Sequence, residues 1–430
     1  MKLADIIDTF ITGDWGEESP TQDTPNAAYC VRGADIVPIT NHNFTDIPQR
    51  YVCDRTKETK LLAAGDLVIE KSGGSPTQST GRIVYVSEDL IKAKGNVVCS
   101  NFCTAFRVKA GWNPLYVYYF WQNVYNHGAF FNFEGKTSGI KNLQLDNALS
   151  AIDIEYLPLE KQNQIVASLA SIDEKIKVNR QINDNLEAMA KQLYDYWFVQ
   201  FDFPNEEGKP YKSSGGAMVW NEKLKREIPT SFDVKSLSEI IEVKDGTHDS
   251  PKPQDNGYFL LTSKHLTERG LDYTSAYKIS KEDYESINKR SKVDTNDILF
   301  SMIGTIGNSY FVEETNINFA IKNMALFKTS AKRWFSEYLY LYLSSCDYKH
   351  YEGNSLSGSI QKFVSLRTLR DMPILYHEDI IKVFAKEVRN IITMMVNLRK
   401  ENIELTKQRD ELLPLLMNGQ ASVNYHLSDD

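Results

Sequence analysis

The sequence predicts an α+β protein in which two copies of one globular domain are separated by two long antiparallel helices and related by a pseudo-twofold axis. Two observations predict this fold. The first is a series of collinear matches between the two halves of the 430-residue chain, at separations of roughly 215 to 235 residues. The second is a pair of long segments with apolar residues at helical spacing, one after each half of the repeat.

The internal repeat is made of short matches, and their common order is what indicates a duplication. The matching segments are 3–7 with 237–241, 65–69 with 296–300, 81–86 with 307–312, 139–141 with 359–361, and 191–192 with 407–408, together with Trp112 and Trp334, and Pro158 and Pro373. A duplicated chain can present two similar surfaces, as a dimer does. Two such surfaces that have diverged can read two different things.

Gly, Pro and polarity divide the chain into alternating globular and rod-like parts. We expect a first domain over 1–158, a central helix over 159–203, a linker over 204–228, a second domain over 229–373, a distal helix over 374–418 and a C-terminal tail over 419–430. Each predicted helix carries an apolar stripe that needs a partner along its length, so we expect the two helices to pack together.

A single Asn interrupts each stripe at a core-like position, Asn179 in the central helix and Asn402 in the distal one. An Asn buried in a coiled coil fixes the register of the helices at some cost in stability. The alternative is that both residues lie at the edge of the stripe.

Composition places the chain among globular proteins, with 42% apolar and 25% charged residues. The net charge of −8 counts against a nucleic-acid ligand, because such proteins are usually basic. The charge is uneven, however: residues 230–373 hold 18 Lys plus Arg against 19 Asp plus Glu, and residues 1–158 hold 14 against 18. A DNA-binding protein of this composition would depend on locally placed cations and would bind weakly alone.

Cysteine usage and hydropathy indicate a cytoplasmic protein. The five cysteines, at 30, 53, 99, 103 and 346, form no paired framework, and the Met-Lys-Leu-Ala-Asp start lacks the apolar stretch of a signal peptide. Cys99 and Cys103 could join Cys30 and Cys53 around zinc, but no C-x-x-C motif is present, so buried thiols are favoured.

Three motifs suggest catalysis only weakly. Trp112 to Tyr116 is similar to the N-P-P-Y element of adenine methyltransferases, but Leu115 replaces the second Pro, and Asn113 with Pro114 is better interpreted as the start of a helix. Residues 335–338 are expected to be a capping sequence in the second copy. Gly135-Lys136-Thr137 lacks the first Gly of a phosphate loop, since position 130 is Phe. Asp66 with Glu70 is only a faint nuclease-like carboxylate pair, so no catalytic site is predicted.

Two loops in each copy carry small, hydroxylated and basic residues that allow close approach to a polar surface. They are 71–82 and 136–141 in the first copy and 301–307 and 354–362 in the second; plain hairpin loops are the alternative. The candidate binding residues are Lys71, Ser72, Gly73, Gly74, Thr77, Thr80, Arg82, Lys136, Thr137, Lys141, Thr247, His248, Lys264, Ser301, Gly304, Thr305, Lys322, Asn323, Ser357 and Lys362.

Aromatic residues crowd the end of the central helix, in greater number than one helix stripe can bury. The candidate partner-binding residues are Tyr194, Tyr196, Trp197, Phe198 and Phe201. They form either the joint with the second domain or anchors for another protein.

The chain resembles the specificity (S) subunits of Type I restriction-modification enzymes over nearly its whole length. The strongest mark is Tyr194-Asp195-Tyr196-Trp197-Phe198-Val199-Gln200-Phe201-Asp202-Phe203-Pro204, followed by 208–216 and 226–229; Leu157 to Gln162 also looks like the family's start of a spacer helix. The resemblance implies a subunit without catalytic activity. Its two target recognition domains would each read one half of a split double-stranded DNA target, and the helices would set the unread spacer.

The resemblance also implies partners. Two modification (M) subunits would dock on the helices and the aromatic segment and supply S-adenosylmethionine-dependent adenine methylation. Restriction (R) subunits would add translocation and cleavage that depend on ATP and Mg. No cofactor is expected on this chain. Two other classes stay open: a fused methyltransferase or nuclease, against which the missing motifs argue, and a coiled-coil adaptor that binds only protein.

Overall fold

The computed structural model describes residues 1–73, 78–135, 140–267, 270–355 and 363–421. Its contacts divide the chain into two compact units. Unit 1 is Met1–Val178 with Ile403–Asp430, and unit 2 is Asn179–Asn402. Each unit combines sheets with helices, which confirms the predicted α+β class.

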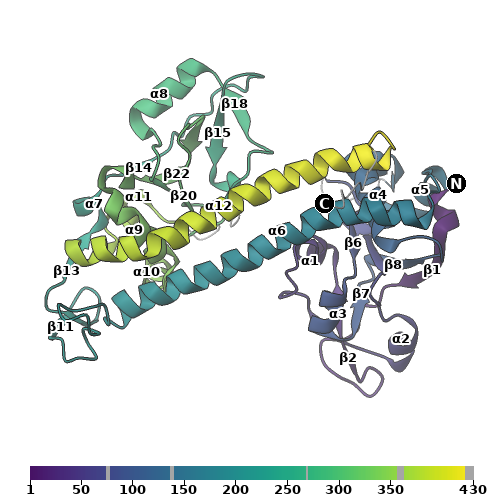
Figure 1. Cartoon of the computed structure of the whole chain (residues 1–430), viewed down its shortest axis with the longest axis horizontal. Coiled ribbons are helices and arrows are strands. Elements are labelled where there is room, and N and C mark those ends of the chain that lie inside the picture. Colours follow the sequence, from purple (N-terminus) through teal and green to yellow (C-terminus); the bar gives the residue numbers. More distant parts are fainter. Residues whose placement is uncertain (74–77, 136–139, 268–269, 356–362, 422–430) are drawn as a thin grey trace, which may run out of the picture. The chain divides into compact units, whose positions relative to one another are not determined.

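The described residues of unit 1 form three small sheets, and strands of two of them are labelled in Figure 1. In strand order they are β1 (Ile7–Thr12), β8 (Cys103–Val108), β4 (Leu67–Glu70) and β6 (Ile83–Tyr85); β3 (Gln49–Val52), β2 (Asn26–Val31) and β7 (Val97–Cys99); and β5 (Ser72–Gly73), β10 (Lys141–Leu143) and β9 (Glu134–Gly135). Its shorter helices are α1 (Ile36–Thr40), α2 (Asp54–Thr59), α3 (Glu88–Lys94), α4 (Pro114–Asn126) and α5 (Leu145–Ala151), with 3-10 turns at Leu3–Ile6, Gly33–Asp35 and Ala129–Phe133.

Unit 2 has two sheets of the same kind and three two-stranded pairs. The sheets are β14 (Val243–Asp245), β22 (Met324–Phe327), β19 (Ile298–Ser301) and β20 (Ser309–Phe311); and β18 (Tyr277–Ile279), β15 (Tyr258–Thr262) and β21 (Phe319–Lys322). The pairs are β11 (Met218–Asn221) with β12 (Arg226–Pro229), β13 (Asp233–Ser236) with β23 (Pro373–Tyr376), and β16 (Leu266–Thr267) with β17 (Gly270–Leu271).

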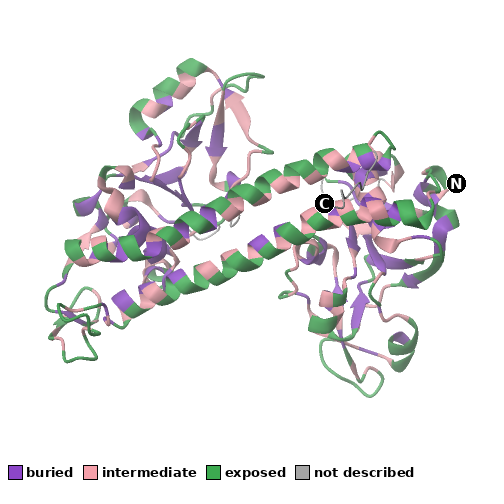
Figure 2. Cartoon of the chain, viewed as in Figure 1, coloured by how far each residue is buried: buried purple, intermediate pink, exposed green. Residues whose placement is uncertain are grey.

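The shorter helices of unit 2 are α7 (Leu237–Ile240), α8 (Lys281–Ser291), α9 (Arg333–Ser344), α10 (Cys346–Ser355) and α11 (Leu366–Arg370), with 3-10 turns at Ser263–His265 and Thr329–Lys332. The central strands of the main sheets, β4 in unit 1 and β19 and β22 in unit 2, are buried along their whole length, and Figure 2 shows buried strands in both units.

The two units share one topology, which supports the predicted duplication. The four-stranded sheets have equivalent orders, β1-β8-β4-β6 and β14-β22-β19-β20, and are antiparallel throughout. In the three-stranded sheets, β2 lies between antiparallel β3 and parallel β7, as β15 lies between antiparallel β18 and parallel β21. The same mixture of strand directions in the same chain order is what two diverged copies of one domain would retain.

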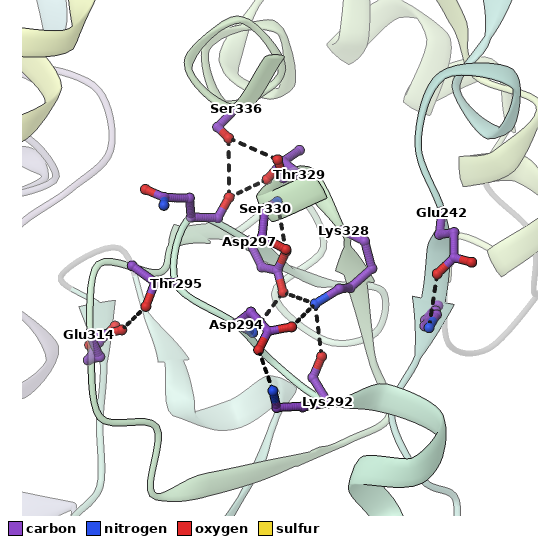
Figure 3. Close-up of polar contacts among 12 residues, drawn as sticks. Glu242, Lys292, Asp294, Thr295, Asp297, Glu314, Lys328, Thr329, Ser330 and Ser336 are labelled. Carbon is purple, nitrogen blue, oxygen red and sulfur yellow. Dashed lines mark hydrogen bonds and ion pairs between the residues drawn. The ribbon is translucent and has the colours of Figure 1, made fainter. Parts of the chain in front are cut away.

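A buried carboxylate holds the same turn in both units. Asp297 accepts hydrogen bonds from the backbone nitrogens of Asp294 (2.8 Å) and Ser330 (3.0 Å) and forms an ion pair with Lys328 (Figure 3). In unit 1, Asp66 accepts the backbone N–H of Ala63 at 2.7 Å and pairs with Arg107 at 2.8 Å. Asp66 is thus a structural anchor, which leaves the nuclease-like interpretation without support.

The two long helices are α6 (Leu159–Tyr194), which continues as a π-helical turn over Asp195–Val199, and α12 (Glu378–Met417). Within each unit their segments pack antiparallel. In unit 1, Ile165 and Leu169 share a buried core with Leu413 and Leu416. In unit 2, the buried residues at the end of α6, such as Tyr194, share a core with Phe384 near the start of α12.

The core-like position expected for Asn179 is confirmed, whereas Asn402 is only half-buried. Asn179 is fully buried, and its Nδ2 donates to Oε2 of Glu401 at 2.8 Å and to Oδ1 of Asn402 at 3.0 Å. A slip of one helix along the other would leave this amide buried without its partners, a loss that opposes alternative registers.

The element boundaries differ from the expected ones in three places. The helical stretch from Leu159 ends at Val199 rather than 203, and Phe201 adopts a left-handed φ of 64° just beyond it. Residues 374–376, expected in the distal helix, belong to β23, where they pair with β13. The expected linker 204–228 contains most of the β11–β12 hairpin.

Of the two predictions about helix starts, one is confirmed and one is wrong. Oδ1 of Asn113 caps α4 by accepting from the backbone nitrogens of Leu115 (2.8 Å) and Tyr116 (3.3 Å), as expected. Residues 335–338 are not a cap, because α9 already begins at Arg333 and Glu337 lies fully buried inside it, paired with Arg333 and Arg389. Across the described residues, no helix combines the length and apolar character needed to cross a membrane.

Glu337 joins α9 to α12, so its removal should destabilise the chain. Glu337→Gln is expected to lower the free energy of unfolding by about 1–3 kcal/mol, because one buried acceptor loses its charge while the two arginines lose their partner. Asp371→Asn is the matched control: it breaks an exposed pair with Arg367 and should cost under about 0.5 kcal/mol. Urea denaturation measures both, and equal effects of the two variants would contradict the prediction.

Candidate functional site

In unit 1, the described ends of the two predicted loops lie side by side. Strand β5 pairs with β10, with Gly73 opposite Lys141 and Ser72 opposite Asn142, and the carbonyl of Lys71 accepts the N–H of Leu143 at 2.8 Å. Loops separated by some 70 residues in the sequence therefore form one surface. The candidates Gly74, Thr77, Lys136 and Thr137 lie outside the described residues.

Glu134 on β9 connects residues of both loops. It forms an ion pair with Nζ of Lys141 at 2.9 Å and accepts the N–H of Thr80 at 2.8 Å. Burial opposes ionisation of Glu134, but the hydrogen bonds from Lys141 and Thr80 outweigh it, so its pKa lies below the usual value. Lys141 is therefore held in place by a charged partner, with its ammonium also 5.3 Å from the ring centre of Phe131.

Arg82 is engaged within the protein. Its guanidinium binds both carboxylate oxygens of Glu70, at 2.7 and 2.8 Å, and this hydrogen-bonded pair raises the pKa of Arg82. The pair is largely buried, with side-chain exposures of 17% and 4%. Gly73 lies against the same carboxylate at φ 146°, where a Cβ atom would come within 2.5 Å of Oε1 of Glu70. The arginine and the glycine together fix the path of the loop.

In unit 2, the equivalent loops are joined in the same way. Ile303 forms an antiparallel bridge with Phe363, and the N–H of Val364 donates to the carbonyl of Met302 at 3.0 Å. Gly304 beside this crossing has a left-handed φ of 80° and open space at its Cβ position. Thr305 next to it is exposed, whereas Ser357 and Lys362 lie outside the described residues.

A second group of candidate residues in unit 2 lies at the same end of the four-stranded sheet as the first group. Thr247 bridges Lys322, and the His248 ring contacts Oδ1 of Asn323 at 2.8 Å and Oδ2 of Asp245 at 3.0 Å. Lys264 is exposed on the neighbouring turn, whose Ser263 donates to the carbonyl of Asn323 at 2.9 Å.

The link between the two groups is the pairing of Ser301 on β19 with Met324 on β22. Both sets of unit 2 candidates therefore occupy one end of the sheet. Three candidates, Thr80, Thr247 and Ser301, are buried, so they support the loops from inside. Direct contact with a ligand stays a prediction for the exposed members.

The aromatic cluster is mostly internal. Tyr194, Trp197, Phe198 and Phe201 belong to the main core of unit 2, where the ring of Phe198 lies 4.7 Å from that of Tyr338 and 4.9 Å from that of Phe384. The predicted joint with the second domain accounts for these four side chains. Tyr196 is 37% exposed, so the prediction of a partner contact is narrowed to this residue.

The cysteines show no arrangement for a metal. Among the described residues, no three His, Cys, Asp or Glu side chains are placed to hold an ion. Burial raises the pKa of Cys30 to about 12 and that of Cys103 to about 11, which opposes the thiolate form that zinc requires.

Three exposed residues at these surfaces were missed by sequence reasoning. Asn142 and Phe363 each lie one residue beyond a predicted loop, and Phe102 lies in the turn before β8, where its carbonyl accepts from Lys71 and Ser72. Phe102 carries no signal of its own, because an isolated Phe between strands is usually read as core.

The fold and its paired loops define a duplicated α+β protein that presents the same kind of surface twice. The sequence model of the Type I restriction modification DNA specificity domain matches residues 3–188. The chain is 26% identical over 292 residues to the Type I restriction enzyme MjaIX specificity subunit of Methanocaldococcus jannaschii, a match that covers 64% of this chain and 62% of that protein. The chain is therefore similar to Type I restriction-modification specificity subunits.

Two further comparisons extend this similarity, one in sequence and one in fold. The HindI specificity subunit of Haemophilus influenzae is 22% identical over 329 residues, covering 64% of this chain and 70% of that protein. The crystal structure of the Type I S subunit from M. genitalium shares the fold with a TM-score of 0.52 at 14% identity, over 97% of this chain and 95% of that one.

Removal of the Arg82 guanidinium should act first on stability. In Arg82→Ala the Glu70 carboxylate stays buried without its cation, and we expect the free energy of unfolding to fall by about 1–3 kcal/mol. The double variant Glu70→Gln/Arg82→Ala should recover part of this loss, because no charge is left buried. Chemical denaturation measures both variants, and an unchanged Arg82→Ala would show that the pair has no structural role.

Alanine substitutions in the aromatic segment should distinguish its buried residues from its exposed one by their effect on stability. Phe198→Ala removes a fully buried ring and is expected to cost about 3–5 kcal/mol of stability. Tyr196→Ala should change stability by less than about 0.5 kcal/mol, since its side chain is partly solvated. Thermal melting of both variants checks this, and a large loss in Tyr196→Ala would place that residue in the core as well.

Proposed function

We propose that this chain is the non-catalytic DNA sequence-recognition subunit of a Type I restriction-modification complex, and that each unit reads one half of a split double-stranded target. One observation carries the proposal: in both units the described residues at the ends of the two equivalent loops pair with each other beside the equivalent sheet, yet different residues stand there. Two units with the same backbone framework but different exposed side chains could bind two different half-sites. The family match supports DNA as the ligand.

On an acidic chain, the positive charge that contacts DNA must come from cations gathered at the binding surface. The candidate cations Lys71, Lys141, Lys264 and Lys322 are spread over two surfaces, and Lys141 shares its charge with Glu134. Since phosphate neutralisation supplies most non-specific affinity, the chain alone should bind DNA weakly. Partner subunits would add much of the grip on the backbone, and this chain would supply the base contacts that specify the sequence.

Two M subunits would bring S-adenosylmethionine and flip the target adenine into their own pockets. R subunits would add translocation and cleavage driven by ATP with Mg. The carboxylates that could suggest a nuclease, Asp66 and Glu70, are each committed to an arginine, which fits a chain that recognises and does not cleave. Such a complex would work in the cytoplasm, where the DNA is.

The long helices would have two tasks in this complex. Helix α6 alone, with 36 residues, is about 54 Å long at 1.5 Å per residue, long enough to set the unread spacer between two half-sites. Exposed apolar residues such as Val178 and Met189 on α6 and Met394 on α12, with Tyr196 beyond α6, would contribute to the docking surface for M.

An adaptor that binds only protein remains the competing function. Filter binding of duplex DNA by the chain with and without its M subunit separates the two. The recognition function requires sequence-selective retention of DNA by the complex, whereas the adaptor would leave DNA binding by M unchanged in sequence preference.

Exchange of one recognition domain should change one half of the target. If residues 1–158 are replaced by the corresponding domain of another family member, we expect adenine methylation mapped across the host genome to keep one half of the sequence and change the other. The reciprocal exchange of residues 229–373 is the matched control and should change the other half. Coupled changes in both halves, or none, would contradict modular recognition.

A further inference from the structure

The strand register shows that a turn of unit 1 and a turn of unit 2 hold equivalent positions in their sheets. The ladder between β4 and β8 ends at Cys103, and the ladder between β19 and β22 ends at Met324. Phe102 and Asn323 directly precede these residues, so they hold equivalent positions in the two units. Asn323 takes a left-handed φ of 54° in this turn.

The crossing of the two loops supplies a second pair of equivalent positions. In unit 1 Ser72 lies opposite Asn142, and in unit 2 Ile303 lies opposite Phe363. In both units the residue after the second of these donates its backbone N–H to the carbonyl of the residue before the first. The main-chain framework is therefore the same, and only the side chains differ.

The chemistry at the two positions is exchanged between the units. In unit 1 the crossing is polar, with Oγ of Ser72 donating to Oδ1 of Asn142 at 2.5 Å, and the turn carries Phe102, which is 55% exposed. In unit 2 the crossing is apolar, with Ile303 36% and Phe363 38% exposed, and the turn carries Asn323. Each unit thus presents one exposed apolar group and one amide, in opposite places.

The turn and the crossing are neighbours within each unit. The carbonyl of Phe102 accepts the N–H groups of Lys71 at 2.8 Å and Ser72 at 3.1 Å. In unit 2, Ser301 pairs with Met324 just after the turn and lies two residues before Ile303. Single exposed apolar residues are common on protein surfaces. An exposed apolar group at one of these two matched positions in each unit, within or directly beside the loops proposed to face DNA, is a more specific pattern.

We propose that these exposed apolar side chains are base-reading residues, and that Phe102 in unit 1 and Phe363 with Ile303 in unit 2 contact the C5-methyl group of thymine in the major groove. The inference rests on the proposed function and deepens it. The thymine methyl is the one apolar feature that a base pair presents in the major groove, and Phe is among the side chains that contact it. The exchange of positions would place the thymine differently in the two half-sites.

Deoxyuridine tests this directly, because it lacks only the C5-methyl group. The complex of this chain with its M subunits is bound to duplexes that carry the target mapped by adenine methylation, with each thymine replaced in turn by deoxyuridine. In each half-site at least one replacement should raise the Kd about fourfold, the ratio expected for loss of one buried methyl group.

Variants assign each effect to its residue. Phe102→Ala should abolish the deoxyuridine effect in the half-site of unit 1 and leave that of the other half unchanged. Phe363→Ala should do the reverse, so that each variant is the control for the other. Trp220→Ala removes an aromatic side chain that is 54% exposed on the β11–β12 hairpin of unit 2, and it should alter neither effect. Melting temperatures within a degree or two of the unaltered chain verify folding.

Three results would overturn the inference while the proposed function stands: selective binding that no deoxyuridine replacement weakens, a variant that alters both half-sites alike, or a variant that weakens every duplex equally and keeps the deoxyuridine effect. Failure of the proposed function looks different, since the unaltered complex would then methylate and retain DNA without sequence preference.

Discussion

The need to cover two long apolar stripes is the constraint on which the rest of the structure depends. Neither α6 nor α12 could stay in water alone, so each is covered by the other and by a globular unit. Unit 1 contributes the hydroxyl of Tyr119, which donates to Asp173 of α6 at 2.5 Å, and Asp173 also binds Arg409 of α12. Unit 2 contributes Glu337, which binds Arg389 of α12. Helices joined only by apolar contacts could pack in several registers. The hydrogen bonds of Asn179, together with these polar contacts, select one.

Duplication explains why the framework is so similar and the surface so different. The turns at Asp66 and Asp297 and the loop crossings recur in the two units with the same backbone hydrogen bonds. The exposed side chains beside them, such as Asn142 in one unit and Phe363 in the other, can change once the backbone is fixed. Selection on the ligand can then act on contact residues without disturbing the fold.

Much of the fold could be predicted from the sequence, because the informative patterns are local or repeated. The helical period of the stripes, the Asn113 cap and the order of the matches all survive in the structure. The other predictions are wrong because they depend on contacts between residues that are far apart in the sequence. Ser336 and Glu337 have the composition of a cap, yet the buried carboxylate pairs with arginines that only the fold brings near. Residues 374–376 are apolar enough for a helix, and only the presence of β13 makes them a strand.

The candidate surfaces show the same division. The pairing of loops in each unit follows from the repeat. The engagement of Arg82 by Glu70 could not be anticipated, because the sequence places Arg82 in a loop and Glu70 in a weak carboxylate pair, and only the pairing of β4 with β6 brings them together. Charge counting alone would also mislead. Glu134 and Asp245 lie within the proposed faces, but they orient Lys141 and His248. Acidic groups that position donors lower the affinity for phosphate in general, and they leave discrimination to the contacts that depend on sequence.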